Sequence, residues 1–406
     1  MTHALIAGGG IAGAATALAL RKAGISSTIH EAFPAGADDV GAFLTIMHNG
    51  MNALSAIDAG TLVAEASFPA DSVEILDAGG LRTGLREYEN DPGAHLGPRT
   101  LRRSELYRVL QDAAVDRGCR VEHGKRVTRA EHRGGAVHVG FDDGSWAEGD
   151  LLVGADGIHS TVRTIIDAEA PSPRYTGLNI VYGYARRTTP ADITCRYRMG
   201  RGARAAFGYI HTPDGETWWF GRLPGSELSR EEMAARTAEE WKRYATGFFA
   251  EDGTSMADLV RSTAPGDIVV SNAYDVPSTP RWWRDSMVLA GDAAHAASPA
   301  AGQGASMALE DSVTLAKCLR DLPTIEVALT AYEGLRRDRV EQLVAASAAH
   351  DSPPPERSEV DSGGARETSA APDTGPARRR WLYGHHIDWH TRIPETPGAD
   401  DSSPST

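Results

Sequence analysis

A glycine-rich turn near the N-terminus limits the possible folds of this chain more than any other feature. The apolar run of residues 3–7 is typical of a buried strand, and residues 11–23, rich in alanine and leucine, favour a helix. Between them lies Gly8-Gly9-Gly10-Ile11-Ala12-Gly13, which fits the pattern GxGxxG. Residues 26–30 are again strand-like. The pattern predicts a βαβ unit and therefore a parallel sheet.

The same turn is a candidate site for a dinucleotide. Glycines let backbone N–H groups come close to a pyrophosphate, and the N-terminus of the following helix favours its negative charge. Glu31 ends the second strand, at the separation expected for a carboxylate that accepts the ribose hydroxyls. The alternative is a glycine-rich turn that binds no ligand. The predicted cofactor-binding residues here are Gly8, Gly10, Ile11, Ala12, Gly13 and Glu31.

Two later segments repeat the order of strand, turn and helix. Residues 151–163, LLVGADGIHSTVR, place an Asp-Gly turn after a strand, a connection that by itself is equally consistent with a purely structural role. Residues 287–316 lead from a buried strand through a Gly-Asp pair into a loop shaped by proline and glycine. The long helix predicted for residues 304–321 would direct the positive end of its dipole at a developing negative charge.

Net charge and cysteine content argue against several classes of protein. The formal net charge is −14, and an acidic surface argues against a nucleic-acid partner and against an anionic membrane. The three cysteines, Cys119, Cys195 and Cys318, are far apart, which argues against a zinc site or a disulfide framework. We therefore expect no metal site. We also find no signal-peptide pattern and no run of about 18 apolar residues, and therefore expect a cytoplasmic protein.

In their order and spacing, the glycine turn, the GADG segment and the GDAAH…P..GQG segment resemble the class A flavoprotein monooxygenases, which include the p-hydroxybenzoate hydroxylase type. The resemblance extends from residue 3 to residue 345. It implies bound FAD, with NADPH or NADH as a transient reductant that needs no second dinucleotide fold. It also implies O2 chemistry, in which a flavin hydroperoxide hydroxylates or epoxidises an aromatic or polycyclic small molecule, in natural-product tailoring or antibiotic modification.

The resemblance assigns roles to individual residues. Arg103 precedes a helix and would contact FAD, and Asp156 would serve both FAD and the pyridine nucleotide. Asp292 would hold the ribityl or pyrophosphate part of FAD. The stretch WLYGHHIDW, residues 381–389, resembles the closing segment of the family. The remaining predicted contacts are Val127 and, beside the isoalloxazine ring, Pro299, Gly302, Gly304 and Ala305.

The residues that face the substrate are harder to select. His48 stands where the family often has proline, and it is either an acid or base for a substrate hydroxyl or a packing histidine. The alternating middle of the chain predicts an antiparallel sheet with one covered face, interrupted by a helix near residues 230–249. Its aromatic side chains would line a substrate pocket, although each of them could equally belong to the core. The predicted pocket residues are Tyr184, Phe207, Tyr209, Trp219 and Gly221.

The expected fold class is α/β, with a Rossmann-like FAD-binding domain and an antiparallel-sheet substrate domain, as in p-hydroxybenzoate hydroxylase. We assign residues 1–173 and 287–350 to the first, with an inserted β-meander at residues 119–150, and residues 174–286 to the second. Residues 351–377 and 394–406 are expected to be disordered, and residues 378–393 to pack on the FAD-binding domain. We expect a monomer or weak homodimer. Two other functions stay open, a reductase or dehydrogenase on the same fold and a non-catalytic flavin redox sensor.

Overall fold

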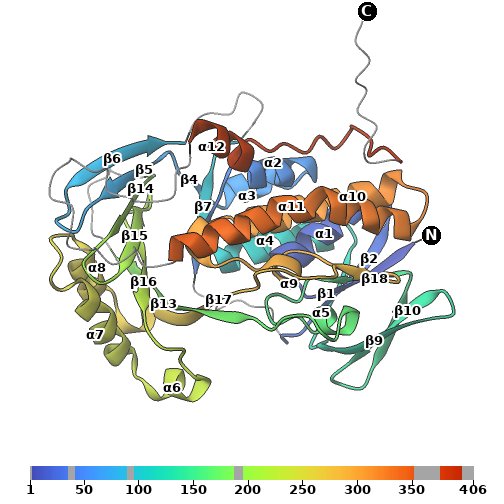
Figure 1. Ribbon diagram of the computed structural model, residues 1–406, viewed down its shortest axis with the longest axis horizontal. Coiled ribbons are helices and arrows are strands. Elements are labelled where there is room, and N and C mark those ends of the chain that lie inside the picture. The colour runs from blue at the N-terminus through green and yellow to red at the C-terminus, as the bar shows by residue number, and fades with distance from the viewer. Residues whose placement is uncertain (1, 35–41, 89–95, 187–194, 352–374, 396–406) are drawn as a thin grey trace, which may run out of the picture.

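The computed structural model describes residues 2–34, 42–88, 96–186, 195–351 and 375–395. Figure 1 shows two joined parts, a six-stranded, mostly parallel sheet with its helices and a seven-stranded mixed sheet. This is the α/β architecture expected from the sequence. None of the helices in the described ranges combines the length and the apolar character that crossing a membrane requires.

The parallel sheet aligns the ends of the three motif-bearing strands. Its order is β18-β19-β12-β1-β2-β8, and only the β18–β19 pair at the edge is antiparallel. The register sets Ala7 beside Gly154 and Gly154 beside Leu289, so β1, β12 and β19 end at the same level. The three motif turns therefore leave the sheet side by side at its carboxyl edge, where ligands of open α/β sheets bind. The strands are β1 (His3–Ala7), β2 (Ser26–Glu31), β8 (Arg120–His123), β12 (Leu151–Gly154), β18 (Trp283–Arg284) and β19 (Met287–Leu289).

Helices α1 (Ile11–Lys22) and α10 (Gly304–Asp321) pack against each other in this part. α1 is rich in buried alanines, and small side chains let two helices approach closely. Thr16 Oγ1 donates to Ser312 Oγ at 3.1 Å across the contact. The predicted helix at residues 304–321 is confirmed at both ends. The other helices of this part are α2 (His48–Ala56), α3 (Gly60–Glu65), α4 (Arg103–Asp116), α5 (Thr161–Ile166), α9 (Asp292–His295) and α11 (Ile325–Asp351).

Two small antiparallel sheets adjoin the parallel sheet. The β-meander predicted for residues 119–150 is confirmed for β9, β10 and β11 but is wrong at its start, because β8 pairs with β2 in the parallel sheet. The second small sheet has the order β3-β7-β4, and its strands β3 and β7 lead directly into α2 and α4. The strands are β9 (Val127–Arg133), β10 (Ala136–Phe141), β11 (Trp146–Gly149), β3 (Phe43–Ile46), β4 (Phe68–Pro69) and β7 (Arg99–Arg102).

The seven-stranded sheet has the order β17-β13-β16-β15-β14-β5-β6 and is antiparallel except for the β14–β5 pair. The strands β13 to β17 come from residues 174–286, as the alternating pattern predicted. β5 and β6 come from residues 72–87, which the sequence-based division assigned to the FAD-binding domain, so the sheet crosses the predicted boundary. The strands are β5 (Ser72–Leu76), β6 (Arg82–Glu87), β13 (Arg174–Ala185), β14 (Arg196–Arg201), β15 (Ala206–His211), β16 (Thr217–Pro224) and β17 (Ile268–Asp275).

The two faces of the seven-stranded sheet have different partners. One face packs against α7 and α8 through side chains that include Phe207 and Trp219. The opposite face meets β3, where the rings of Trp218 and Phe43 lie 5.6 Å apart between centroids. Only this second face is turned toward the part that carries the glycine turn. The helices on this sheet are α6 (Arg230–Ala235), α7 (Ala238–Phe249), α8 (Met256–Ser262) and the 3₁₀ turn η2 (Pro265–Asp267).

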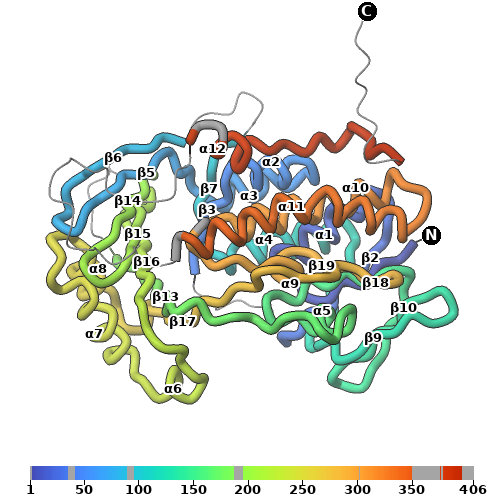
Figure 2. The backbone as a smooth tube through the Cα atoms, viewed as in Figure 1, coloured from blue at the N-terminus to red at the C-terminus, as the bar shows by residue number. Residues whose placement is uncertain are grey.

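The last described segment returns to the parallel-sheet part, and Figure 2 shows its backbone passing along α2 and α10 after α12 (Pro376–Tyr383). Arg320 of α10 donates to the carbonyl oxygen of Trp389 at 2.7 Å. Arg339 of α11 donates to the carbonyl oxygen of Leu382 at 2.8 Å. Most of the predicted disordered stretches, residues 351–377 and 394–406, lie outside the described residues.

Candidate cofactor-binding and active site

The glycine turn has the shape of a phosphate cradle. Gly8 has a φ of 98°, its N–H donates to the carbonyl oxygen of His30 at 2.8 Å, and a Cβ at Gly8 would lie 2.5 Å from the carbonyl oxygen of Ala155. A Cβ at Gly13 would overlap the carbonyl oxygen of Gly8. Around Gly10, in contrast, nothing lies within 4 Å of the Cβ position. The start of α1 therefore offers a fixed backbone with open space, as a pyrophosphate requires.

Glu31 lies at the edge of this turn. Its Oε2 accepts the N–H of Gly9 at 2.6 Å, and its Oε1 accepts the N–H of Phe33 at 2.9 Å. Gln111 of α4 donates from its side chain to the carbonyl oxygen of Gly9 at 2.5 Å. The sequence did not single out Gln111, although it follows Arg103 by about two helical turns and so shares its face of α4. Glu31 is thus held in place, and its contact with a ribose stays a prediction.

Arg103, Tyr107 and Asp292 form a polar cluster next to the turn. The guanidinium of Arg103 lies 5.4 Å from the ring centroid of Tyr107. Burial lowers the pKa of Arg103, but Tyr107 and Asp292 more than offset this effect, so the pKa is raised above its usual range. Burial raises the pKa of Tyr107, and the nearby carboxylate of Asp292 raises it further. The fold therefore brings together the two residues, Arg103 and Asp292, to which the resemblance gives FAD contacts.

The loop before α10 lies beside this cluster. Pro299 begins the 3₁₀ turn η3 (Pro299–Ala301), and Gly302 follows with a φ of 61°. Pro299 and Gly302 are both exposed. A Cβ at Gly304 would lie 3.8 Å from Oδ1 of Asp292, which connects the loop to the cluster. Ala305 follows as the second residue of α10, and the contact of these residues with a flavin ring stays a prediction.

Three helices begin in this region with neither a side-chain cap nor an acidic residue in the first turn. They are α1, α2 and α10. α6 and α7, which lie on the other sheet, begin instead with capping boxes at Ser229 and Thr237. An uncapped helix N-terminus carries partial positive charge, so the three helices favour a ligand that is negatively charged or becomes so.

Asp156 has a structural task that the sequence did not reveal. Its carboxylate accepts hydrogen bonds from Ser160 Oγ at 2.5 Å and from the N–H of Thr161 at 2.8 Å, and so caps α5. Arg163 of the same helix donates to the carbonyl oxygen of Ala293 at 3.0 Å. The turn after β12 is therefore fixed to the turn after β19. A direct contact of Asp156 with FAD or with a pyridine nucleotide stays a prediction.

His48 and Val127 are both buried. His48 is the first residue of α2 and is 4% exposed, and its role as an acid or base stays a prediction. Val127 begins β9 opposite Phe141 and belongs to the hydrophobic core. The N–H of Lys125 donates to the carbonyl oxygen of Glu31 at 2.8 Å, which places the chain just before Val127 beside the predicted ribose site. A contact of the Val127 side chain with the cofactor stays a prediction.

Four of the five predicted pocket residues lie on the face of the seven-stranded sheet that packs against α7 and α8. Trp219 Nε1 donates to Thr263 Oγ1 at 2.8 Å, below α8. Phe207 packs edge-to-face on Phe249 of α7 with centroids 6.0 Å apart. Alternation along the strands divides their residues into two sets, one on each face of the sheet. Both sets are apolar because both faces are covered. The four residues are Phe207, Tyr209, Trp219 and Gly221, and their contact with a substrate stays a prediction.

The face turned toward the cofactor cluster is also aromatic. Tyr184 is the one predicted pocket residue that lies on it. Burial raises the pKa of its neighbour Tyr182, and the charge of Arg103 acts in the opposite direction, which shows that this phenol lies near the cluster. We define the aromatic face as the side chains of this sheet face together with Phe43 of β3 and Phe68 of β4, which pack against it; the sheet residues are Tyr182, Tyr184, Tyr197, Trp218 and Phe220.

A buried charge network joins α10 to α11 behind the loop. Arg336, 1% exposed, donates from Nη1 to Glu310 Oε2 at 2.5 Å and from Nε to Asp311 Oδ1 at 2.7 Å. Arg339 donates to both carboxylate oxygens of Glu310, at 2.8 and 2.9 Å. Asp311 Oδ2 accepts the N–H of Gly291 at 2.9 Å. The network therefore fixes the turn after β19 to the start of α10.

This network predicts a loss of stability in acid. Burial would raise the pKa of Glu310, but Arg336 and Arg339 lower it to about 2. Because the folded pKa lies below the unfolded value, Glu310 stabilises the fold above the unfolded pKa, and this contribution is lost as the pH falls toward about 2. Urea unfolding at about pH 6, 4 and 3 should show a falling free energy of unfolding. The Glu310→Gln variant lacks the titrating carboxyl group, so its free energy of unfolding should fall less steeply with decreasing pH. Equal pH dependence in the variant and the wild type would contradict this assignment.

The residues present fit FAD. The open space at Gly10 and the carboxylate of Glu31 suit the pyrophosphate and the ribose, and the Arg103–Asp292 cluster lies next to them. Two buried polar atoms near the start of α10, Asn49 Oδ1 and Gln303 Nε2, have no hydrogen-bond partner in the described part of the chain. Both atoms are fully buried in the protein alone, so they lie behind the surface that a cofactor would contact.

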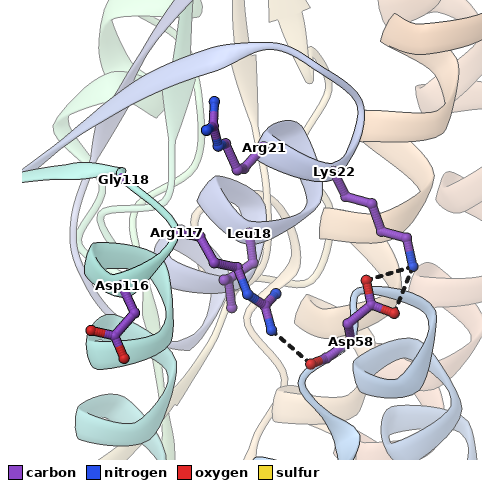
Figure 3. Close-up of a pocket in the computed structure, with 7 residues that line it drawn as sticks. All are labelled: Leu18, Arg21, Lys22, Asp58, Asp116, Arg117 and Gly118. Carbon is purple, nitrogen blue, oxygen red and sulfur yellow. Dashed lines mark hydrogen bonds and ion pairs between the residues drawn. The ribbon is translucent and has the colours of Figure 1, made fainter.

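A polar hollow of about 640 Å³ at the surface, shown in Figure 3, lies elsewhere. It adjoins Lys22 at the C-terminal end of α1, about 17 Å along the helix from the glycine turn. Two of its cations are engaged, because Lys22 pairs with Asp58 at 2.8 Å and Arg117 donates to the carbonyl oxygen of Asp58 at 2.7 Å. These contacts support Asp58, whose φ of 59° is unusual for a residue with a side chain. We therefore assign this hollow a structural role.

Comparisons with known proteins agree with this site. The sequence matches the family described as FAD binding domain over residues 1–347. It is 33% identical over 346 residues to aurachin C monooxygenase/isomerase of Stigmatella aurantiaca, across 84% of this chain and 87% of that protein. FAD-dependent urate hydroxylase of Klebsiella oxytoca is 31% identical, again across 84% of this chain and 87% of that protein. The crystal structure of Klebsiella pneumoniae HpxO with FAD and uric acid aligns with a TM-score of 0.76 at 27% identity, covering 86% of this chain and 87% of that one.

These matches confirm the family inferred from the three motifs, together with the p-hydroxybenzoate hydroxylase-like fold and the class of enzyme. They extend over both sheets, so the likeness is not limited to the nucleotide-binding turn. The motifs, the geometry of the site and the matching relatives agree: the chain belongs to the family of FAD-dependent monooxygenases that carry this FAD-binding domain.

Proposed function

We propose that this enzyme uses NADPH or NADH and O2 to place one oxygen atom on a hydrophobic aromatic or polycyclic small molecule. The observation that supports the proposal is the aromatic face, which meets the cofactor cluster where Tyr182 approaches Arg103. Two of the relatives are by their names an aurachin C monooxygenase/isomerase and a urate hydroxylase. We infer that the reaction is a hydroxylation or an epoxidation and that it serves natural-product tailoring or antibiotic modification.

The chain's contribution is placement of the substrate and exclusion of water, while bound FAD supplies the activation of O2. Phe43 lies against four other rings of the aromatic face, with centroids 5.6 to 6.4 Å apart. A surface of this kind binds flat apolar rings through buried area and edge contacts, and it holds little water. Exclusion of water favours oxygen transfer over release of H2O2.

The phenols on this face keep their protons at neutral pH. Burial raises the pKa of Tyr184 to about 12 and that of Tyr197 to about 12. Such groups can donate a hydrogen bond to a substrate oxygen, but they do not act as bases at neutral pH. The oxygen of Tyr197 already accepts a hydrogen bond from Thr45 Oγ1 at 2.8 Å, which fixes its position. These groups therefore orient a substrate rather than remove its protons.

The direct test is oxidation of NADPH and NADH by FAD-loaded protein, with O2 and H2O2 followed together, across a panel of aromatic and polycyclic compounds. A compound that stimulates O2 consumption and lowers the H2O2 formed per NAD(P)H supports the proposal. Oxygen from ¹⁸O2 should then appear in the product. Turnover that is indifferent to O2 would support a reductase instead, and turnover that no compound stimulates would support a redox sensor.

Two neighbouring tryptophans provide a matched test of the face. Trp218→Phe should raise the KM for substrate and the fraction of H2O2 released, because Trp218 lies on the aromatic face. Trp219→Phe should instead lower the free energy of unfolding by about 1–3 kcal/mol, because it removes the hydrogen bond from Trp219 Nε1 to Thr263 Oγ1 and part of the buried ring in the core under α8. Steady-state kinetics and urea unfolding of both variants separate the two effects. The reverse result would place the substrate on the α7–α8 side.

A further inference from the structure

An arginine lies at the edge of the seven-stranded sheet, on the same side as the aromatic face. Arg86 belongs to β6, the last strand of that sheet, and stands opposite Val73 of β5. Directly paired residues of neighbouring strands share a face, and Val73 packs among the rings of the aromatic face. Arg86 Nε is buried and has no hydrogen-bond partner among the described residues. A donor that has lost water without gaining a partner is costly, so this side chain calls for an acceptor.

The carboxylates of the neighbouring strands are turned away from Arg86. Glu74 follows Val73 in β5 and therefore points to the opposite face. There its oxygens lie 3.0 to 3.5 Å from the guanidinium nitrogens of three other arginines, Arg82, Arg196 and Arg198. Glu87 follows Arg86 in β6, so it also points the other way, and it is exposed. No carboxylate of β5 or β6 is thus available to Arg86.

Tyr88 adds a second donor beside Arg86. The guanidinium of Arg86 lies 6.0 Å from the ring centroid of Tyr88. Burial raises the pKa of Tyr88, Arg86 opposes this effect, and the phenols of Tyr197 and Tyr383 add to it. The phenol of Tyr88 therefore keeps its proton at neutral pH and can donate a hydrogen bond. Because Tyr88 packs against the cluster that contains Tyr197, the arginine adjoins the aromatic face directly.

Small molecules can reach this end of the face. Arg86 and Tyr88 are partly exposed, and so are Ile75 of β5 and Met199 of β14, which pair with each other on the same side of the sheet. Tyr197, further along the face, is 6% exposed. A ligand can therefore place a polar group at Arg86 while its rings lie against the aromatic side chains. Apolar sites with a few polar groups that fix orientation are the common form of small-molecule site.

We propose that Arg86 and Tyr88 bind a carboxylate of the substrate, so that the substrate is an aromatic or polycyclic acid. This inference rests on the proposed function and narrows its substrate class. The planar guanidinium offers a carboxylate parallel N–H donors, and the hydroxyl of Tyr88 offers one more. The acid group is held at the edge strand of the sheet, and the rings extend along the aromatic face toward the cofactor cluster.

The experiment compares acids with their uncharged amides. FAD-loaded protein is titrated at neutral pH with 2-naphthoate and 2-naphthamide, and with anthracene-2-carboxylate and its amide, by the change in flavin absorbance. The wild type should bind the acid of at least one pair about tenfold more tightly than the amide. Arg86→Met keeps the length of the side chain without its charge and should bind the two members alike.

Arg82→Met is the matched control. Arg82 lies on the same strand and carries the same charge, but it is turned to the other face, where it pairs with Glu74 at 3.5 Å. This variant should keep the preference for the acid. Tyr88→Phe removes only one hydroxyl and should weaken binding of the acid about fivefold. It therefore gives an answer even if Arg86→Met fails to fold.

The inference is overturned if the wild type prefers neither acid over its amide, or if Arg86→Met keeps the preference. An equal loss in Arg82→Met would overturn it as well, because the protein would then respond to net charge alone. If Arg86→Met does not fold, unchanged binding of the acid by Tyr88→Phe is the contradicting result. All these titrations measure binding without turnover, so an acid that binds through Arg86 but never couples to O2 consumption would contradict the proposed function alone.

Discussion

Replacing Arg336 with alanine is expected to lower the free energy of unfolding by about 3–5 kcal/mol, as the loss of one partner from a buried ion pair does. Arg336 lies between the carboxylates of Glu310 and Asp311, and both carboxylates are fully buried. Without this cation they must take up protons or draw in water, and either response weakens the contact between α10 and α11. Urea unfolding followed by far-UV circular dichroism, with FAD at a fixed saturating concentration, measures the effect.

The adjacent Arg337 provides the control. It pairs with Glu333 at 2.5 Å and Glu341 at 2.8 Å along the partly exposed side of α11. Arg337→Ala should cost less, about 1–2 kcal/mol, because water can replace its carboxylate partners and only its hydrogen bonds to the carbonyl oxygens of Thr279 and Pro280 are lost without compensation. Similar losses in the two variants would show that α11 is held by packing of its apolar side chains and that the buried charges contribute little.

The second large effect concerns FAD itself. Gly10→Ala is expected to weaken FAD binding by about 100-fold, equivalent to ~2.8 kcal/mol, while the apoprotein stays folded. No atom lies within 4 Å of the Cβ position in the protein alone, so the new methyl group collides only with a ligand at the start of α1. Gly13→Ala should lose FAD binding and also stability, because its Cβ overlaps the carbonyl oxygen of Gly8.

Gly247→Ala is the matched control for these glycine variants. Gly247 lies in α7, on the other sheet, and also has no atom within 4 Å of its Cβ position. This variant should bind FAD normally and gain a little stability from better helix propensity. Fluorescence titration of the four apoproteins with FAD makes the comparison. An affinity of Gly10→Ala within about twofold of the wild type would remove the glycine turn from the FAD site.

The sequence revealed those parts of the site that short segments encode. The glycine turn, the helix beginning at Gly304 and the strand before Asp292 each have a local pattern, because turn, cap and helix are fixed by neighbouring residues. The sequence also carries a local signal for the break between α6 and α7, because Ser229 and Thr237 each precede a glutamate by three residues. We predicted one helix at residues 230–249 because those two capping boxes were not taken into account.

Features that depend on distant partners could not be derived in this way. Alternation along β16 separates Trp218 from Trp219, but it does not tell which of them faces the cofactor, because both faces of the sheet are apolar. Arg336 and Arg339 have the spacing of exposed helix charges, and only the packing of α11 on α10 shows that they are buried. The pairing of β5 with β14 joins segments far apart in the chain, which no local window can detect.

Because residues 376–393 pack back on α10 and α11, the support of the cofactor site is completed late during synthesis of the chain. The nucleotide cradle leaves the ribosome first, yet β19 and α10 follow only after the second sheet. The carbonyl groups of Trp381 and Leu382, which bind Arg339, are synthesised later still. Strand pairing across such long separations is slow, so cofactor loading is a late step in biosynthesis. A chain interrupted after α11 would carry the cradle for the nucleotide without the support on which Arg339 and Glu310 depend.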